Sequence, residues 1–323
     1  MTIDKLSYHM LDIEPDKVAR EVEKWVKQTV FGTFRKKGVV IGLSGGIDSS
    51  VSAAICVNAL GKDNVLGLFT PEKECDIETN TLGKLIADHL EIEAIKEDIT
   101  PILDGAGCYR RRNDAIRMTI KEFRDTWGSK VVLPNVLESD RLSISSIVVQ
   151  DNEGNLIRKR MNFRSYHQVV ASSNFKQRSR KMMEYYHADR LNYAVVGTPN
   201  KLEYDLGFFV KNGDGAADIK PIAHLYKKQV YVLGRYYELP DEILSRPPTT
   251  DTYSLPQSQE EFYFSLPFEM MDLSLFAYEN GYSAHDLSEA LKISMEKAER
   301  VFRDIEGKKK VASFLSNPPE IFH

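Results

Sequence analysis

A segment rich in glycine and serine, Gly42-Leu43-Ser44-Gly45-Gly46-Ile47-Asp48-Ser49, has the residue types best suited to chemistry in this sequence. Glycines let a backbone approach a phosphate closely, and serine hydroxyls and the amides of a helix N-terminus donate hydrogen bonds to anionic oxygens. Asp48 alone would repel phosphate, so its presence suggests a bridging Mg²⁺. The segment predicts a site for the phosphates of ATP, and a plain Gly/Ser turn is the alternative.

This loop lacks the Gly-Lys-Ser/Thr ending of a Walker A loop, whose lysine serves transfer of the γ-phosphate. Ser-Gly-Gly-x-Asp-Ser instead resembles the pyrophosphate loop of enzymes that release AMP and pyrophosphate. Thiolating tRNA enzymes with such a loop usually carry cysteine pairs, which Cys56, Cys75 and Cys108 do not form. Asparagine and GMP synthetases normally carry a glutaminase domain, for which 323 residues leave no room. Free ammonia, or ammonia from a partner, is therefore the simplest nitrogen source.

The elements that must position this loop follow an alternating α/β pattern. Short apolar runs predict strands at 39–43, 65–69, 93–95 and 193–196. Helical spacing of apolar residues predicts helices at 18–34, 49–60, 76–90, 174–189 and 227–237. Such alternation predicts a doubly wound parallel sheet, an α/β fold, with the loop at a switch point of the sheet.

Residues from about 104 to 167 interrupt the alternation. They are rich in Arg and Lys, and they contain a short helix pattern at 117–127 and a hairpin pattern at 147–157 around a polar turn. Charge runs usually face water, so a solvated insertion is the favoured interpretation. A lid or an anion-binding flap is the alternative.

The C-terminal part is predicted to be helical from about residue 273, with a break at 280–282. Two further helices, 283–291 and 294–305, have the spacing of a helix-turn-helix. Because the chain is acidic and offers no basic recognition face, two packed helices are the better interpretation. We therefore expect one domain over residues 1–323, with the insertion and this helical part attached to the sheet.

Composition excludes several classes of protein. A net charge of −4 and a pI near 6.0 give no general attraction to nucleic acid or anionic lipid. No apolar run approaches 18 residues, and the N-terminus lacks the apolar core of a signal peptide. The three widely spaced cysteines favour a reducing cytoplasm and argue against a structural zinc or disulfides. We expect a cytoplasmic enzyme with neither a nucleic-acid nor a membrane partner.

Several separate segments in the second half narrow the interpretation. They are Asn174 to Arg180, Gly197 to Glu203, Gly207 to Asp218, Pro221-Ile222, Leu225 to Lys227 and Pro247 to Thr249. In order and spacing, these segments and the phosphate loop together resemble NAD synthetase. The resemblance covers nearly all of the chain except the insertion.

The resemblance implies roles for individual residues. Asp48 and Glu203 match the carboxylates that hold Mg²⁺. The residues from Gly42 to Ser49, with Thr198, Lys227 and Thr249, match positions that hold ATP. Arg178, Lys211 and Asp218 match positions that hold deamido-NAD, and Lys308 keeps the lysine of a C-terminal tail that reaches the substrate. Asp48, Glu203 and Lys227 are then the expected catalytic residues, since Lys227 is suited to stabilise charge that develops on phosphate.

The implied reaction joins ammonia to a carboxylate. The nicotinate of deamido-NAD attacks the α-phosphorus of ATP, which gives an acyl-adenylate and pyrophosphate, and ammonia then displaces AMP. The family also implies a homodimer. Three departures concern the acceptor side: Gly307 where the family has a histidine, Pro199 where it commonly has Gly or Asp, and the long basic insertion. They leave open another acid acceptor, such as a sugar acid or a different nucleotide. A non-catalytic nucleotide-binding protein is a weaker alternative, against which the intact Asp48, Glu203 and Lys227 argue.

Overall fold

A four-stranded parallel sheet forms the centre of the protein. The computed structural model describes residues 5–75, 77–132, 145–248, 253–259, 263–264 and 266–322. The strands, in the order in which they pair, are β3 (Glu93–Lys96), β2 (Val65–Phe69), β1 (Val39–Gly42) and β7 (Ala194–Val196). β2 and β7 lie on opposite sides of β1, so the order in which strands are added to the sheet changes side at β1, which is the topological switch point. The predicted strands and the doubly wound parallel sheet are confirmed.

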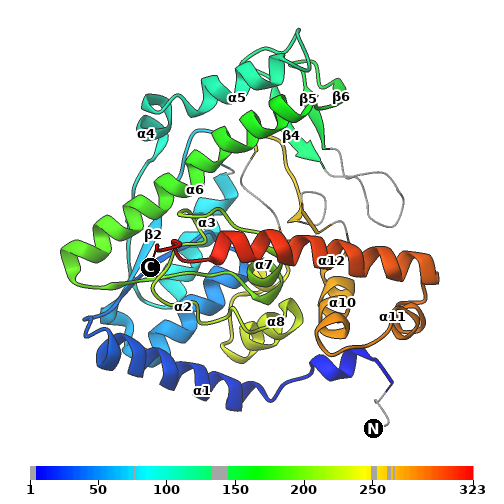
Figure 1. Cartoon of the computed structure of the whole chain (residues 1–323). Coiled ribbons are helices and arrows are strands. Elements are labelled where there is room, and N and C mark those ends of the chain that lie inside the picture. Colours follow the sequence, from blue (N-terminus) through cyan, green and yellow to red (C-terminus); the bar gives the residue numbers. More distant parts are fainter. Residues whose placement is uncertain are drawn as a thin grey trace.

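Helices cover both faces of this sheet, because side chains alternate between its faces along each strand. Val39 and Ile41 pack in the main core with α1 (Pro15–Lys27), α2 (Ile47–Leu60), α3 (Ile77–His89) and α8 (Lys227–Tyr236). Val40 and Val195 point the other way, against α6 (Phe163–Leu191). α6 crosses the molecule diagonally in Figure 1. The helix predicted at 18–34 ends as an α-helix at Lys27 and continues as a π-helix, η2 (Gln28–Thr33).

The insertion contains a second, antiparallel sheet of β4 (Gly128–Val132), β5 (Ser146–Gln150) and β6 (Leu156–Arg160), with helices α4 (Thr100–Gly105) and α5 (Cys108–Arg117). The predicted hairpin is therefore confirmed. The helix predicted at 117–127 is wrong, because α5 ends at Arg117 and the chain then turns so that Ile120 and Phe123 both enter the insertion's own core. These elements lie together at the top of Figure 1.

α6 begins eleven residues earlier than the sequence predicted, at Phe163 instead of 174. The side chain of Asn162 accepts a hydrogen bond from Ser165 N and so caps the helix. Its buried residues include Ser165, Ser172 and Ser173, which give no apolar stripe. Only the first part of the helix was missed, because the helix packs against the insertion on that part and against the sheet on another.

The C-terminal helices form a separate core with α7 (Lys201–Leu206). They are α10 (Phe268–Glu279), α11 (Ala284–Leu291) and α12 (Met295–Ser316). Leu287 of α11 packs with Ala298 and Val301 of α12, so the predicted pair of packed helices is confirmed, as is the break after Glu279. Short helices η1 (Tyr8–Leu11), η3 (Lys62–Asn64) and α9 (Asp241–Leu244) complete the described elements.

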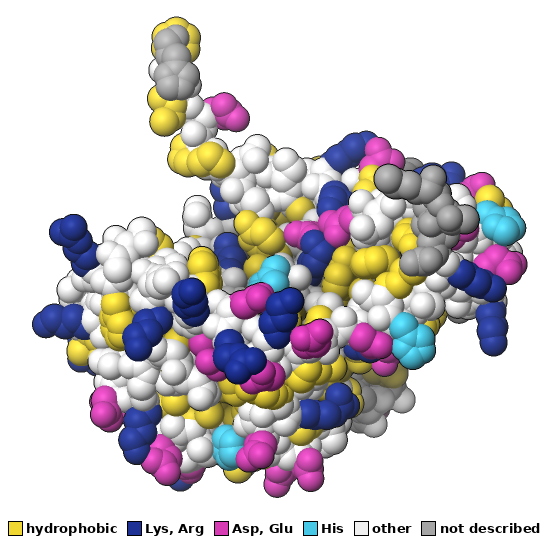
Figure 2. All heavy atoms as spheres, turned by 90° about the horizontal axis from the view of Figure 1, so that it is seen from below, with side chains coloured by type: hydrophobic (Ala, Val, Ile, Leu, Met, Phe, Trp, Pro, Cys, Tyr) yellow, Lys and Arg dark blue, Asp and Glu magenta, His cyan; other side chains and the backbone are white. Residues whose placement is uncertain are grey.

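Charged side chains of both signs lie beside one another on the face shown in Figure 2. None of the helices in the described ranges combines the length and the apolar character needed to cross a bilayer.

The contact between α7 and α12 supplies a stability test. Gly207 caps α7 with a φ of +77°, and a Cβ there would lie 3.0 Å from Ala312 Cα in α12. Gly307 lies on the exposed face of α12, where a Cβ would meet no other atom within 4 Å. Gly207→Ala should lower the free energy of unfolding by about 1–3 kcal/mol. Gly307→Ala should raise it by up to about 1 kcal/mol, since alanine is the better helix former. Urea denaturation measures both, and equal effects would contradict the role of Gly207.

Candidate active site

The glycine- and serine-rich loop joins β1 to α2, as the sequence predicted. Gly45 has a φ of +70°, and a Cβ at this position would lie 2.5 Å from Leu82 Cβ in α3, so only glycine fits. The hydroxyl oxygens of Ser44 and Ser49 lie 3.1 Å apart, and Ser49 Oγ donates to Gly46 O at 3.0 Å. The loop therefore presents preorganised hydroxyls at the N-terminus of α2, where anions bind.

A buried charged centre lies beside the loop. Lys227, the first residue of α8, forms an ion pair with Asp48, which belongs to the first turn of α2. The Lys227 side chain is only 3% exposed. Asn200 ties the third charge to this pair: its side-chain amide donates to Asp48 Oδ1 at 3.0 Å, and its backbone N–H donates to Glu203 Oε2 at 3.1 Å. The structure thus brings Asp48, Glu203 and Lys227 together from three helices.

The charges of this centre perturb one another. Burial raises the pKa of Glu203 to about 8, and the nearby charge of Asp48 contributes to the rise while Lys227 opposes it. Burial lowers the pKa of Lys227, but Asp48 and Glu203 outweigh burial, so that pKa is raised and the lysine stays charged. Two carboxylates therefore share one buried cation, and this arrangement would accommodate a second positive charge.

The two carboxylates fit Mg²⁺ as donors. The described part of the chain holds no group of three or more His, Cys, Asp or Glu side chains that would form a complete metal site. Mg²⁺ is commonly held by one or two carboxylates, with substrate phosphates and water as the other ligands. Asp48 and Glu203, next to a phosphate loop, match that pattern.

Asp272 holds the N-terminus of α8 in place. This residue of α10 is fully buried, and its two carboxylate oxygens accept hydrogen bonds from the backbone amides of Lys227 (3.1 Å) and Lys228 (2.8 Å). Burial raises the pKa of Asp272 to about 7, although these two bonds oppose the rise. Sequence reasoning missed this residue, because a single aspartate in an apolar helix gives no sign of which distant backbone amides it accepts from.

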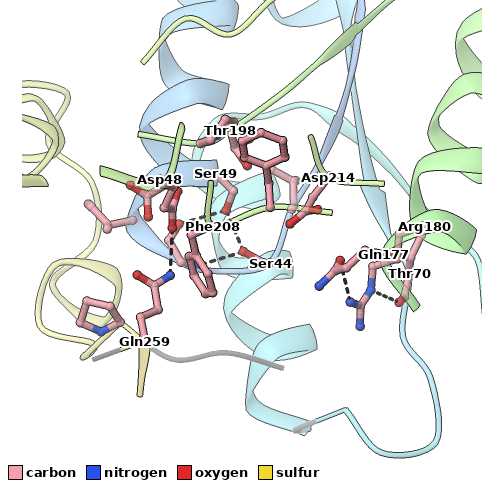
Figure 3. Close-up of a pocket in the computed structure, with 18 of the residues that line it drawn as sticks. Ser44, Asp48, Ser49, Thr70, Gln177, Arg180, Thr198, Phe208, Asp214 and Gln259 are labelled. Carbon is pink, nitrogen blue, oxygen red and sulfur yellow. Dashed lines mark hydrogen bonds between the residues drawn. The ribbon is translucent and has the colours of Figure 1, made fainter. Parts of the chain in front are cut away.

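A cavity of about 280 Å³ joins the loop and the charged centre. Most of the residues predicted for ATP and metal line it, namely Gly42, Leu43, Ser44, Gly46, Ile47, Asp48, Ser49, Thr198, Glu203 and Lys227. Pro199 lines it as well, although the sequence placed this departure on the acceptor side. Gly45 lies against Leu82 of α3 and is not among the described residues that line the cavity, and Thr249 lies outside the described residues. Figure 3 shows Asp48, Ser44 and Ser49 on one side of this cavity and Arg180 on the other.

The far wall contains residues that sequence reasoning missed. Arg180 of α6 donates to Gln177 Oε1 at 3.2 Å and to the backbone oxygen of Thr70 at 3.5 Å, and all three residues line the cavity (Figure 3). Asp214 and Phe208 also line it, and Gln259 donates to Glu203 Oε1 at 3.0 Å. Arg180 belongs to the segment already singled out at 174–180. Helix spacing could have separated Arg180 from Arg178, because two residues that are two positions apart on a helix point in different directions.

The four residues predicted for the acceptor are not among the described residues that line this cavity. Arg178 Nε donates to Lys211 O at 3.3 Å, and Lys211 Nζ donates to Phe314 O and Asn317 O at the end of α12. Lys211 lines a second cavity of about 170 Å³. Asp218 Oδ2 accepts from Val195 N at 2.7 Å, and Lys308 pairs with Asp304 at 2.6 Å. Their roles in binding an acceptor stay predictions.

Fold and site together define a class. A doubly wound parallel sheet, with a Ser-Gly-Gly-x-Asp-Ser loop after its central strand and a buried lysine between two carboxylates, is the arrangement of an ATP-pyrophosphatase-type nucleotide-binding protein. The chain belongs to the NAD synthase family, whose sequence profile matches residues 18–125 and 115–311. The junction of these two matched segments falls within the insertion.

Relatives with known names agree with this membership. The chain is 55% identical to an "NH(3)-dependent NAD(+) synthetase" of Rhizobium meliloti over 90% of this chain and 86% of the relative. It is 32% identical to one of Methanocaldococcus jannaschii, over 95% and 97%. Among solved structures, an NMN synthetase from Francisella tularensis (TM-score 0.67, 22% identity, covering 96% and 99%) shares the fold. So does an NH3-dependent NAD synthetase from Campylobacter jejuni (TM-score 0.64, 22% identity, covering 97% and 100%).

The raised pKa of Glu203 predicts a pH-dependent cost to stability. In the unfolded chain this carboxyl titrates near 4.5, and in the folded protein near pH 8. The folded state therefore holds a proton that the unfolded state has lost, and the stability from this group disappears as pH rises from about 4.5 to 8. Glu203→Gln does not titrate, so its melting temperature minus that of the wild type should increase between pH 5 and pH 8, measured with a chelator and without nucleotide. A difference in melting temperature that is constant with pH would contradict a raised pKa at this carboxyl.

The same Glu203→Gln variant should also lose about 10²-fold or more of the activity.

Proposed function

We propose that this protein is an ammonia-dependent NAD synthetase, which converts deamido-NAD, ATP and ammonia to NAD, AMP and pyrophosphate. The observation that carries the proposal is the cavity that joins the Ser-Gly-Gly-x-Asp-Ser loop to the Asp48, Glu203 and Lys227 centre. Identity of 55% to a relative with that activity in its name supports the choice of acceptor and nitrogen source.

In this proposal the protein mainly positions ATP and neutralises charge. The loop hydroxyls of Ser44 and Ser49 and the N-terminus of α2 bind the triphosphate. Lys227 stabilises the negative charge that develops on the departing pyrophosphate, and Asp48 keeps its ammonium in place. Mg²⁺ held by Asp48 and Glu203 would neutralise phosphate charge when bound. Arg180 on the opposite wall offers a second cation, with its guanidinium fixed by Gln177 and Thr70.

The acceptor side of the proposal rests on Arg178, Lys211, Asp218 and Lys308. Arg178 Nε contacts the backbone oxygen of Lys211, so the two residues are neighbours, although the Lys211 ammonium has to leave the carbonyl oxygens of Phe314 and Asn317 to bind the same anion. Lys308 is partly buried and paired with Asp304, so it has to exchange that partner to reach a substrate. A homodimer is part of the proposal, because the resemblance to NAD synthetase implies one.

The products test the reaction. Purified protein with Mg-ATP, ammonium and deamido-NAD should form NAD, AMP and pyrophosphate in equal amounts, because the loop lacks the lysine of a γ-phosphate transferase. Chromatography measures the nucleotides NAD, AMP and ADP, and a coupled enzymatic assay measures pyrophosphate and phosphate. Nicotinate mononucleotide serves as the competing acceptor. Formation of ADP and phosphate would contradict the mechanism, and a higher kcat/KM with the mononucleotide would contradict the acceptor.

Two arginines separate the two substrates. Arg180 faces the ATP cavity, and Arg178, two residues earlier on α6, contacts Lys211 instead. Arg180→Ala should raise the KM for ATP, and Arg178→Ala the KM for deamido-NAD, each by roughly 10-fold, as expected for a lost charge-assisted hydrogen bond. Each variant is the control for the other. Steady-state kinetics with saturating ammonium measures both constants, and an effect of Arg178→Ala on ATP alone would reject the proposed acceptor site.

A further inference from the structure

A buried charge cluster ties the insertion to one wall of the ATP cavity. It consists of Glu72 and Glu74 from the segment after β2, Lys176 from α6 and Arg112 from α5. Lys176 Nζ lies 2.8 Å from Glu72 Oε1 and 2.8 Å from Glu74 Oε2. Arg112 binds both oxygens of Glu74, at 2.5 and 2.8 Å. Tyr109 of α5 completes the cluster by donating to Glu72 Oε2 at 2.7 Å.

The cluster is balanced in charge and shielded from water. The side chains of Glu72, Lys176 and Arg112 are 0%, 1% and 4% exposed, and that of Glu74 is 15% exposed. Buried ion pairs of this kind are a weak source of stability compared with apolar packing, because each charge loses its hydration. They do fix geometry, since every carboxylate oxygen here has a defined partner. Arg112 in particular holds Glu74 through two parallel bonds.

The same segment forms the wall of the cavity. Thr70, Pro71 and Cys75 line the cavity, on either side of Glu72 and Glu74. Arg180 lies one turn after Lys176 on α6, and it donates to Thr70 O and to Cys75 Sγ at 3.3 Å. The segment 70–75 is therefore held against α6 at two places. Lys176 binds it outside the cavity, and Arg180 binds it within the cavity. None of the four charged residues of the cluster is among the described residues that line the cavity.

We propose that Lys176 and Arg112 are positioning residues for ATP, which act through Glu72 and Glu74 to fix the wall segment 70–75 and, with it, the guanidinium of Arg180. The insertion then serves the nucleotide site from a distance, because α5 supplies Arg112 and Tyr109 to the cluster. This inference rests on the proposed use of ATP. In this proposal the insertion is neither a solvated appendage nor a lid; it supports the wall of the cavity.

A charge-balanced double variant tests this inference. Glu74→Gln/Arg112→Met removes the charged tie between α5 and the wall but leaves the Lys176–Glu72 pair and the Tyr109–Glu72 hydrogen bond intact, so that no unpaired charge is buried. The dissociation constant for a non-hydrolysable ATP analogue with Mg²⁺, measured by calorimetry without acceptor, should rise by about 10-fold or more. The KM for deamido-NAD should stay within about 2-fold, whereas the KM for ATP should rise with the dissociation constant.

The matched control is Asp125→Asn/Arg117→Met. It removes a neighbouring Arg–carboxylate pair that involves the same helix α5, and Arg117 contacts Asp114, Asp125 and Phe123 instead of the wall. Binding of the nucleotide should be unchanged in this variant. All measurements are made well below the melting temperature of each variant, so that a lower stability does not appear as weaker binding.

A pair of single variants covers the case in which the double variant does not fold. Lys176→Arg keeps the charge at the cluster and should bind the nucleotide more tightly than Lys176→Met does. The inference would be overturned if the wild-type protein binds the nucleotide and the double variant binds it equally well. It would also be overturned if the two Lys176 variants bind it equally well. A wild-type protein that does not bind Mg-ATP would overturn the proposed function and the inference together.

Discussion

Two carboxylates and one lysine buried at the end of β1 set the demands on the rest of the structure. A charge removed from water is costly unless each polar atom has a partner, so the helices that carry Asp48, Glu203 and Lys227 must be fixed within a narrow tolerance. Asn200 joins two of them with its own side chain and backbone. Asp272 fixes the third from the C-terminal helices, by accepting the first two amides of α8. The C-terminal core thus supports the candidate active site through Asp272, although no residue of α10 is among the described residues that line the cavity.

α6 contacts three different parts of the molecule along its length. Its first turns pack on the insertion, Lys176 and Arg180 reach the wall of the cavity, and Ala188 packs on the sheet. A 29-residue helix is long enough to connect all three, since each residue adds about 1.5 Å. One helix therefore supports the insertion, the wall of the cavity and the sheet at once.

The same features explain what the sequence alone predicted. Strands β1, β2 and β7 are continuous apolar runs and the phosphate loop is contiguous, so local patterns located them. The start of α6 and strand β4 were not predicted, because their buried residues face several partners and show no single period. Arg180 and Asp272 were missed for a related reason. Their partners, Thr70 and the N-terminus of α8, lie far away in the sequence, and only the folded chain shows which atoms they contact.

The residues that depart from the family pattern divide in space, and this division bears on how specificity changes. Pro199 lines the ATP cavity, next to Asn200, which bridges Asp48 and Glu203. Gly307 lies on the exposed side of α12, where a Cβ would meet no other atom within 4 Å. A change at Gly307 therefore alters neither the charged centre nor the loop. Since the C-terminal helices contact the core through Asp272 and the α7–α12 contact, their outer faces are free to vary while Lys227 stays in place. Under the proposed function, a substitution on this outer side can alter acceptor binding while the residues proposed for ATP stay in place.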